Sequence, residues 1–176
     1  SALAVSHRKS CTIVDRVSYR TVVGRFETVP GTCLLLHTGA VRRAVESGFA
    51  WGQSSITIRT TTYPAWPVTE YSFRVHWNEK RKRLKIAIPV GFAIGRVVCE
   101  VPGGTIDRPP DGQEHVHGRW CILHGMVEGI PAAMAVITSG QHGFDAMDAE
   151  MRISVLRSAA YCHEQGYPLT DPPSRK

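Results

Sequence analysis

Short runs of alternating apolar and polar residues recur along the chain, and they constrain its fold more than any other feature. The alternation is clearest over residues 56–59, 71–78, 84–90 and 151–155. A two-residue period is typical of half-buried β-strands, and the 3.6-residue period of an amphipathic helix hardly occurs. Sixteen glycines and eleven prolines separate these runs. The sequence therefore predicts an all-β fold, a large antiparallel β-sandwich.

The length of 176 residues suits one domain with a sizeable buried core. We predict a single β-sandwich domain over residues 1–166 and a tail or linker over residues 167–176, which carry three prolines. Residues 41–49 fit either a short helix or a strand that enters a turn.

The five cysteines are an odd number and include no Cys-x-x-Cys pair. This pattern argues against a disulfide framework and against a thiolate zinc site, so we expect a reducing, cytoplasmic location. No apolar run approaches the roughly 20 residues that cross a bilayer. The first residues also lack the charged-then-apolar order of a secretory signal, and we expect no membrane partner.

Much of the net charge of +6 comes from one basic run, residues 80–85 (KRKRLK). Several cations close together can bind a nucleic-acid backbone by releasing its counterions. A single-strand binder also needs aromatic side chains beside the charges, and only Trp77 is near. We therefore favour a solvated hairpin end or a charge-protected edge strand, and we expect no nucleic-acid partner.

Two histidines, His115 and His117, stand two residues apart, a spacing that some metal sites in β-sandwich proteins use. Two imidazoles need at least one further ligand, and the surrounding residues 109–118 have the composition of a polar loop. Whether this pair binds a metal stays open, and we assign no metal ligand to the chain.

Acidic residues are numerous between positions 107 and 150. A glycosidase needs two carboxyl groups at a defined separation across a sugar, one of them with a raised pKa. Asp107 and Asp111 instead flank an Arg-Pro-Pro sequence, where an acid more often caps a turn or pairs with arginine. We therefore assign no catalytic residue to this chain.

Arg157 follows the alternating run 151–155 in phase with its apolar members Met151, Ile153 and Val155. A cation at the end of an apolar face either pairs in the core, for instance with Asp145 or Asp148, or extends into a cleft. Both alternatives stay open from the sequence.

Five motifs occur in a fixed order from residue 75 onward. They are 75–80 (VHWNEK) with Leu84-Lys85 and a strand that ends at Pro89, then 104–109 (GTIDRP), Arg119-Trp120, 141–145 (QHGFD) and 156–158 (LRS). Together they resemble the C-terminal β-sandwich region of the family 38 glycoside hydrolases, the α-mannosidases, over about residues 40–164. We expect structural roles for the motif residues Trp77, Glu79, Lys80, Arg108, Arg119, Trp120 and Asp145. His76, Thr138-Ser139 and Ala159 depart from the family pattern, which suggests a divergent member.

The resemblance implies a large antiparallel supersandwich like that of the galactose mutarotases. It also implies hydrolysis of α-mannosides with retention, by two carboxylates and a zinc ion that all belong to an N-terminal barrel. This chain would then be inactive alone and hold no cofactor, with zinc in the parent catalytic domain. Its partners would be that barrel, on the same polypeptide, and a mannose-containing glycan. In the family an arginine of the β-domain approaches the cleft, and Arg157 is the candidate.

Two other functions remain as alternatives. One is a free-standing carbohydrate-binding β-sandwich in which Trp66, Trp77 or Trp120 stacks on a sugar ring, and the other is a basic nucleic-acid-binding domain that uses residues 80–85. A domain separated from its barrel should also expose the apolar face that it would bury there. We therefore expect a homo-oligomer or aggregation of the isolated chain.

Overall fold

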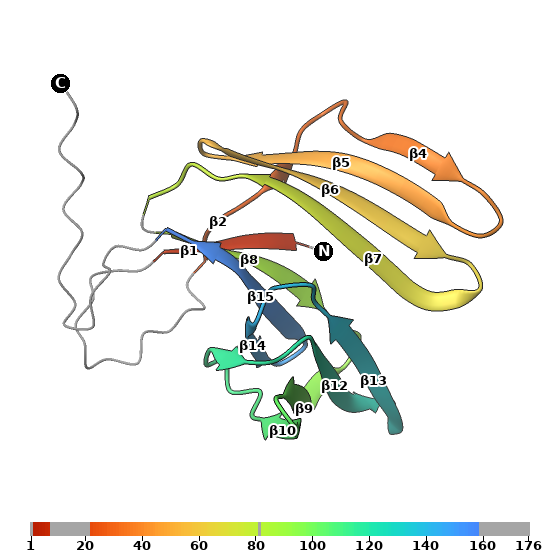
Figure 1. The fold of residues 1–176 in the computed structure, drawn as a ribbon, viewed down its shortest axis with the longest axis vertical. Coiled ribbons are helices and arrows are strands. Elements are labelled where there is room, and N and C mark those ends of the chain that lie inside the picture. The colour runs from red at the N-terminus through yellow and green to blue at the C-terminus, as the bar shows by residue number, and fades with distance from the viewer. Residues whose placement is uncertain (1, 8–21, 81, 159–176) are drawn as a thin grey trace. The chain divides into compact units, whose positions relative to one another are not determined.

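The computed structural model describes residues 2–7, 22–80 and 82–158 (Figure 1). These residues form strands joined by turns and loops, without a helix, which confirms the predicted all-β fold. The strands divide into two compact units, Ser1–Val23 with Lys80–Lys176, and Gly24–Glu79. The prediction of one domain over residues 1–166 stays a prediction, and the predicted tail 167–176 lies outside the described residues.

The first unit contains a six-stranded sheet, called sheet A here, in the order β11-β14-β15-β8-β1-β2. Its strands are β1 (Ala2–His7), β2 (Val22–Arg25), β8 (Lys82–Pro89), β11 (His115–Val116), β14 (Gly143–Met147) and β15 (Glu150–Arg157). The pairs along β11-β14-β15-β8-β1 are antiparallel. The strand β8 is central, because β15 and β1 pair with its two sides.

A four-stranded antiparallel sheet, sheet C, has the order β10-β9-β12-β13. Its strands are β9 (Ala93–Val101), β10 (Gly104–Arg108), β12 (Trp120–Val127) and β13 (Ile130–Ile137). Two-residue turns connect β9 to β10 and β12 to β13, and a glycine with positive φ, Gly103 or Gly129, occupies each turn.

The core of the first unit lies between sheets A and C. Sheet C contributes Ile94, Val97, Cys99, Cys121 and Leu123, and sheet A contributes Phe144, Ala146, Met151 and Ile153. On sheet A the inward residues pair across strands, Phe144 with Ile153 and Ala146 with Met151. The alternation of β14 and β15 therefore leaves Asp145 and Arg152 on the opposite face, away from this core.

The second unit is one antiparallel sheet, sheet B, in the order β3-β5-β6-β7, with β4 also paired to β5. Its strands are β3 (Glu27–Thr28), β4 (Leu34–Thr38), β5 (Arg43–Trp51), β6 (Ser54–Tyr63) and β7 (Trp66–His76). Residues 41–49 therefore belong largely to a strand, β5, which settles the choice between helix and strand. Ile56 and Ile58 are buried on one face of this sheet, and Glu46, Arg59 and Arg74 meet on its other face.

Candidate functional site

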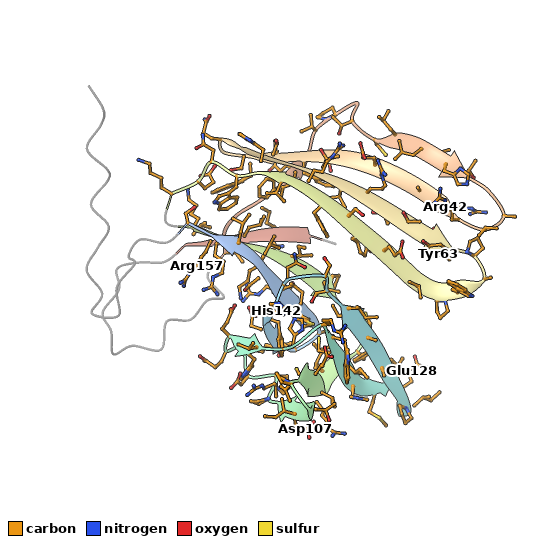
Figure 2. All side chains as sticks on the ribbon, in the orientation of Figure 1. Arg42, Tyr63, Asp107, Glu128, His142 and Arg157 are labelled. Carbon is orange, nitrogen blue, oxygen red and sulfur yellow. The ribbon has the colours of Figure 1, made fainter. Side chains whose placement is uncertain are left out.

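A β-bulge in β15 decides where the side chain of Arg157 lies. Ser154 pairs with Lys85, the register then shifts, and Leu156 and Arg157 pair with Leu84 and Arg83. One extra residue, Val155, is thus inserted between two regular stretches of β15. Figure 2 shows Arg157 at the end of this strand.

The bulge overturns the strand-phase argument for Arg157. Met151 and Ile153 belong to the buried core between the sheets, and the expected phase would have put Arg157 with them. The inserted residue reverses the alternation instead, so Arg157 shares a face with Arg152 and Lys85. This face carries a group of paired charges.

Five charged side chains from four segments form a network that we call the ionic cluster: Arg83, Lys85, Glu114, Asp145 and Arg152. The ammonium of Lys85 donates a hydrogen bond of 2.5 Å to Glu114 Oε2 and another to Asp145 Oδ2. The guanidinium of Arg152 donates from Nε to Asp145 Oδ1 at 3.0 Å. Arg83 forms an ion pair with Glu114 Oε2, with a nitrogen–oxygen distance of 2.8 Å.

The ionic cluster is buried at its centre. Lys85 is 1% exposed, Asp145 is 0% exposed, and Arg152 is also buried. Ions removed from water to this degree are tolerated only when paired and hydrogen-bonded. Each carboxylate accordingly meets two cations, and Glu150 adds a third acid 3.8 Å from Arg152. Three acidic side chains (Glu114, Asp145 and Glu150) thus lie beside three cationic ones (Arg83, Lys85 and Arg152).

The side chain of Glu114 connects the loop before β11 to this face of sheet A. Besides the two cations, its Oε1 accepts a hydrogen bond of 2.5 Å from the Ser154 hydroxyl. Burial alone would raise the pKa of Glu114, but the charge and hydrogen bond of Lys85, with Ser154 and Arg83, lower it overall. Glu114 is therefore a fixed anion and not a proton donor near neutral pH.

Arg157 stands at the exposed rim of the ionic cluster. Its side chain is solvent-exposed and forms no ion pair or hydrogen bond with another described residue. The expected alternative, a core pair with Asp145 or Asp148, does not occur, because Arg152 occupies the remaining oxygen of Asp145. Arg157 is thus a cation with an accessible guanidinium, directly opposite Arg83.

The basic run 80–85 is not an edge strand, and only Lys80, before the strand, is exposed among its described residues. Most of it lies in β8, which is paired on both sides, and Arg81 lies outside the described residues. Arg83 and Lys85 share one face, as strand alternation predicts, but that face is covered by Glu114 and Asp145 and is not open to solvent. The expectation failed because the counterions, Glu114 and Asp145, come from distant parts of the sequence.

The motif at residues 75–80 stabilises a turn of the second unit through Glu79. Glu79 Oε1 accepts hydrogen bonds from the backbone nitrogen of Gln53 at 2.8 Å and from the Ser54 hydroxyl at 3.3 Å. These bonds brace the turn between β5 and β6 at Gly52, whose φ is 57°. Nearby, Trp77 is half-buried and Lys80 is exposed.

A second carboxylate, Glu100, holds the Arg-Trp motif at the start of β12. Glu100 Oε2 accepts a hydrogen bond from the backbone nitrogen of Arg119 at 2.5 Å, and Oε1 accepts one from its guanidinium at 3.3 Å. The backbone bond of Arg119 contributes most to lowering the pKa of Glu100. Trp120 follows half-buried, so the motif serves to fix a strand start.

The acidic residues near Arg108 behave as the sequence indicated. Asp107 accepts two hydrogen bonds from Arg96, at 2.8 and 3.0 Å. Asp111 accepts a bond of 2.9 Å from the backbone nitrogen of Gln113, as in a turn cap. Arg108 lies between them with Nε buried and without an acceptor among the described residues.

The two histidines with metal-like spacing lie in different surroundings. His115 Nε2 is 3.0 Å from Asp111 Oδ1, and His117 is buried between the rings of His142 and Phe144. Burial, followed by the proximity of His142, lowers the pKa of His117. Within residues 2–7, 22–80 and 82–158 no three His, Cys, Asp or Glu side chains are grouped to hold a metal, so the histidine pair does not fit a zinc site.

The three tryptophans considered for sugar stacking are spread along the chain. Trp66 begins β7, is 66% exposed, and contacts the ring of Tyr63 at 5.9 Å between centroids. Trp77 follows the far end of the same strand. Trp120 belongs to the other unit. Trp66 and Trp77 therefore do not form one platform.

The residues whose role in the ionic cluster sequence reasoning missed are Lys85, Glu114 and Arg152, which join Asp145 there. A signal was present, because Lys85 lies in the apolar run 84–90 and Asp145 lies between the apolar residues Phe144 and Ala146. Charges inside such strands are rarely buried unless paired.

Comparison with known proteins gives one family. The family model described as Glycosyl hydrolases family 38 C-terminal domain matches residues 18–170, which is most of the chain and includes the whole ionic cluster. No curated protein matches the chain. Among the described residues there is also no helix that is long and apolar enough to span a membrane.

Proposed function

This chain belongs to the family of glycosyl hydrolases family 38 C-terminal domains, and from that membership we propose that it is the C-terminal β-domain of a retaining α-mannosidase. It packs on an N-terminal catalytic barrel of the same polypeptide and forms part of the carbohydrate cleft. The observation that carries this proposal is the family match over residues 18–170, and the exposed Arg157 supports the role in the cleft.

The carboxyl groups of this chain are consistent with our proposal that the catalytic barrel alone carries out the hydrolysis. A glycosidase general acid needs a raised pKa. Every carboxyl group with a shifted pKa in the described residues is shifted downward: Glu100, Asp107, Asp111 and Glu114. These directions agree with our proposal that the nucleophile, the acid and the zinc site belong to the barrel and that this chain alone is inactive.

Arg157 is the proposed contribution to substrate binding. Its guanidinium offers five donors in a fixed plane, which suits the hydroxyl oxygens of a sugar. Lys85 of β8 and Arg152 of β15 both bind Asp145, and the two strands pair, so the side chain extends from a well-connected strand end. A base that is held in place lowers the entropy cost of binding.

The proposal is tested in the full-length enzyme by replacing Arg157 with alanine and following hydrolysis of an aryl α-mannoside. We expect kcat/KM to fall about tenfold, or about 1.4 kcal/mol of transition-state binding, while the melting temperature is unchanged. Arg42→Ala, which removes an exposed arginine in the turn before β5, is the matched control and should leave both values as they are. Unchanged kinetics for Arg157→Ala would contradict the proposed role of Arg157 in the carbohydrate cleft. Hydrolysis by the isolated chain at an enzyme-like rate would contradict the proposal that the barrel carries all catalytic residues.

We also propose that the parent enzyme works in the cytoplasm. Cys99 and Cys121 lie directly opposite each other on β9 and β12, and both are free thiols. Burial raises the pKa of Cys99 to about 11 and that of Cys121 to about 12, so neither ionises readily. A pair of this kind stays reduced most readily in a reducing compartment. Fractionation of source cells, with the enzyme expected in the soluble cytoplasmic fraction, tests this location.

The second candidate is a free-standing sugar-binding module. The one observation that favours it is the exposure of the Trp66 side chain. Titration of the isolated chain with mannose, followed by tryptophan fluorescence, separates the two functions. A saturable change that Trp66→Ala abolishes would favour the binding module, whereas no change is expected for the β-domain of an enzyme.

A further inference from the structure

Two cysteines, Cys99 of β9 and Cys121 of β12, lie directly opposite each other in sheet C. Both side chains belong to the core between sheets A and C, and both are 0% exposed. Cys121 Sγ is 3.8 Å from Met151 Sδ across that core, and both cysteines are free thiols. How closely the two thiols approach each other depends on their position in the hydrogen-bond pattern of the sheet.

The turn between β12 and β13 fixes the direction in which the backbone of Cys121 bonds. Val127 and Ile130 flank this two-residue turn and therefore form a hydrogen-bonded pair. Bonded and non-bonded pairs alternate along the uninterrupted ladder, and Cys121 comes six residues before Val127. Its backbone groups thus bond to β13 and point away from β9. The bond of 2.8 Å from the Thr138 nitrogen to the Arg119 oxygen fits the same alternation.

The turn between β9 and β10 gives the matching result for Cys99. Val101 and Gly104 flank this two-residue turn, and Cys99 comes two residues before Val101 in a ladder without a register shift. The backbone groups of Cys99 therefore bond to β10 and point away from β12. The carbonyl of its neighbour Glu100 points the other way, because it accepts a bond of 2.7 Å from Gly118, just before β12.

Cys99 and Cys121 therefore form a non-hydrogen-bonded pair of antiparallel strands. In such a pair the Cα atoms lie about 4.5 Å apart, and the side chains are closer than in the hydrogen-bonded type. A disulfide closes when the Cα atoms are about 4.4–6.8 Å apart. The two thiols are thus placed where a cross-strand disulfide can form without a change of strand register.

The folded core protects both thiols from reaction. The thiolate is the form that attacks a disulfide, and burial raises the pKa of Cys99 to about 11 and that of Cys121 to about 12. An oxidant in solution also has no access to side chains that are 0% exposed. Exchange therefore requires the chain to open, so the pair reacts only while sheet C is unfolded or still folding.

We propose that Cys99 and Cys121 are a redox modification site. They close to a cross-strand disulfide when the chain folds in the presence of a disulfide oxidant such as glutathione disulfide, and the folded core then preserves the redox state that it encloses. One thiolate attacks the oxidant, which gives a mixed disulfide and one glutathione. The second thiolate displaces the other glutathione, and the two thiol protons pass to the glutathione released. Two protein thiols are thereby oxidised, and one glutathione disulfide is reduced.

The first test uses the native 176-residue chain and needs no refolding. The chain is incubated with glutathione disulfide at several urea concentrations below its unfolding midpoint, and each cysteine is followed by mass spectrometry. We expect Cys99 and Cys121 to be converted together into one disulfide, at a rate that rises with urea, because urea increases the population of open chain. Cys33, which is exposed, is the internal control and should react at nearly the same rate throughout. Oxidation of the pair at the rate of Cys33 would contradict the protection, and separate mixed disulfides would contradict the pairing.

The second test refolds the reduced chain from urea in the presence of glutathione disulfide. The five cysteines allow ten pairs, and we expect the disulfide between Cys99 and Cys121 to be the principal product. The oxidised chain should melt about 6–12 °C higher than the reduced chain, because the bond restricts the unfolded state. Cys121→Ala should abolish this difference, whereas Cys33→Ala should keep it. A different principal disulfide, or equal melting temperatures for the two redox states, would overturn the proposal.

Discussion

The ionic cluster of sheet A and the charged face of sheet B have the same arrangement of charges, but the first is buried and the second is exposed to water. In both, an acid lies directly across from an arginine, Asp145 from Arg152 and Glu46 from Arg59. In both, a second cation binds the other carboxylate oxygen, Lys85 in sheet A and Arg74 in sheet B. Arg74 has a side chain that is 73% exposed, however, whereas Lys85 is 1% exposed.

Burial changes what these two networks do for the fold. Water screens the pairs of sheet B, and such pairs contribute at most about 1 kcal/mol each. In sheet A the charges have lost their water, so each depends on its partners and removal of one leaves the others uncompensated. Breaking the ionic cluster should therefore cost far more than breaking its counterpart in sheet B.

The largest effect is expected when Asp145 is replaced by alanine. Lys85 and Arg152 then keep their positive charges in a buried site without their shared carboxylate. We expect a loss of about 3–5 kcal/mol in the free energy of unfolding, measured by urea denaturation. Asp107→Ala removes an equivalent carboxylate from an exposed arginine pair and should cost far less, because water solvates Arg96 once it is released. A similar small loss for both variants would contradict the contrast between buried and exposed networks.

A smaller effect is expected for Glu114→Gln, because Glu114 is partly exposed and its loop can readjust. The amide oxygen can accept from Ser154 or from Lys85 but not from both, and the negative charge between Arg83 and Lys85 is lost. We expect the free energy of unfolding to fall by about 1–3 kcal/mol, as for loss of a hydrogen bond to a charged group. Ser154→Ala, which leaves both ion pairs in place, should cost less and serves as the control.

The loss of stability at acid pH tests the same carboxylate through its titration. The pKa of Glu114 is lower in the folded chain than its ordinary value of 4.5, because Lys85 and its neighbours outweigh burial. Its stabilising contribution is therefore complete above pH 4.5 and is lost as the pH falls through the folded pKa. Urea denaturation at a series of pH values should show a shallower acid decline for Glu114→Gln than for the wild type. Parallel curves would mean that Glu114 titrates as it does in the unfolded chain.

The sequence predicted strands well because the two-residue period is a local property of the chain. Residues 71–78, 84–90 and 151–155 all contain β-strand, and the predicted turn cap at Asp111 is present. The face of Arg157 was missed because neither glycine nor proline marks the bulge at Val155. The burial of Lys85 was missed because its partners Glu114 and Asp145 are 29 and 60 residues away in sequence. Interactions that distant have no local pattern.

The smallest effect is expected for Glu46→Gln in sheet B. This variant tests the solvent-exposed network against the buried one. The variant removes the charge that Arg59 and Arg74 share, but water can solvate both guanidinium groups once they are released. We expect a loss of less than about 1 kcal/mol at low ionic strength, and almost none in 1 M salt, where the Debye length is about 3 Å. The Asp145→Ala loss should persist in the same salt, because ions do not reach a side chain that is 0% exposed. If salt weakened both effects equally, the ionic cluster would be open to solvent, and the distinction between the two sheets would disappear.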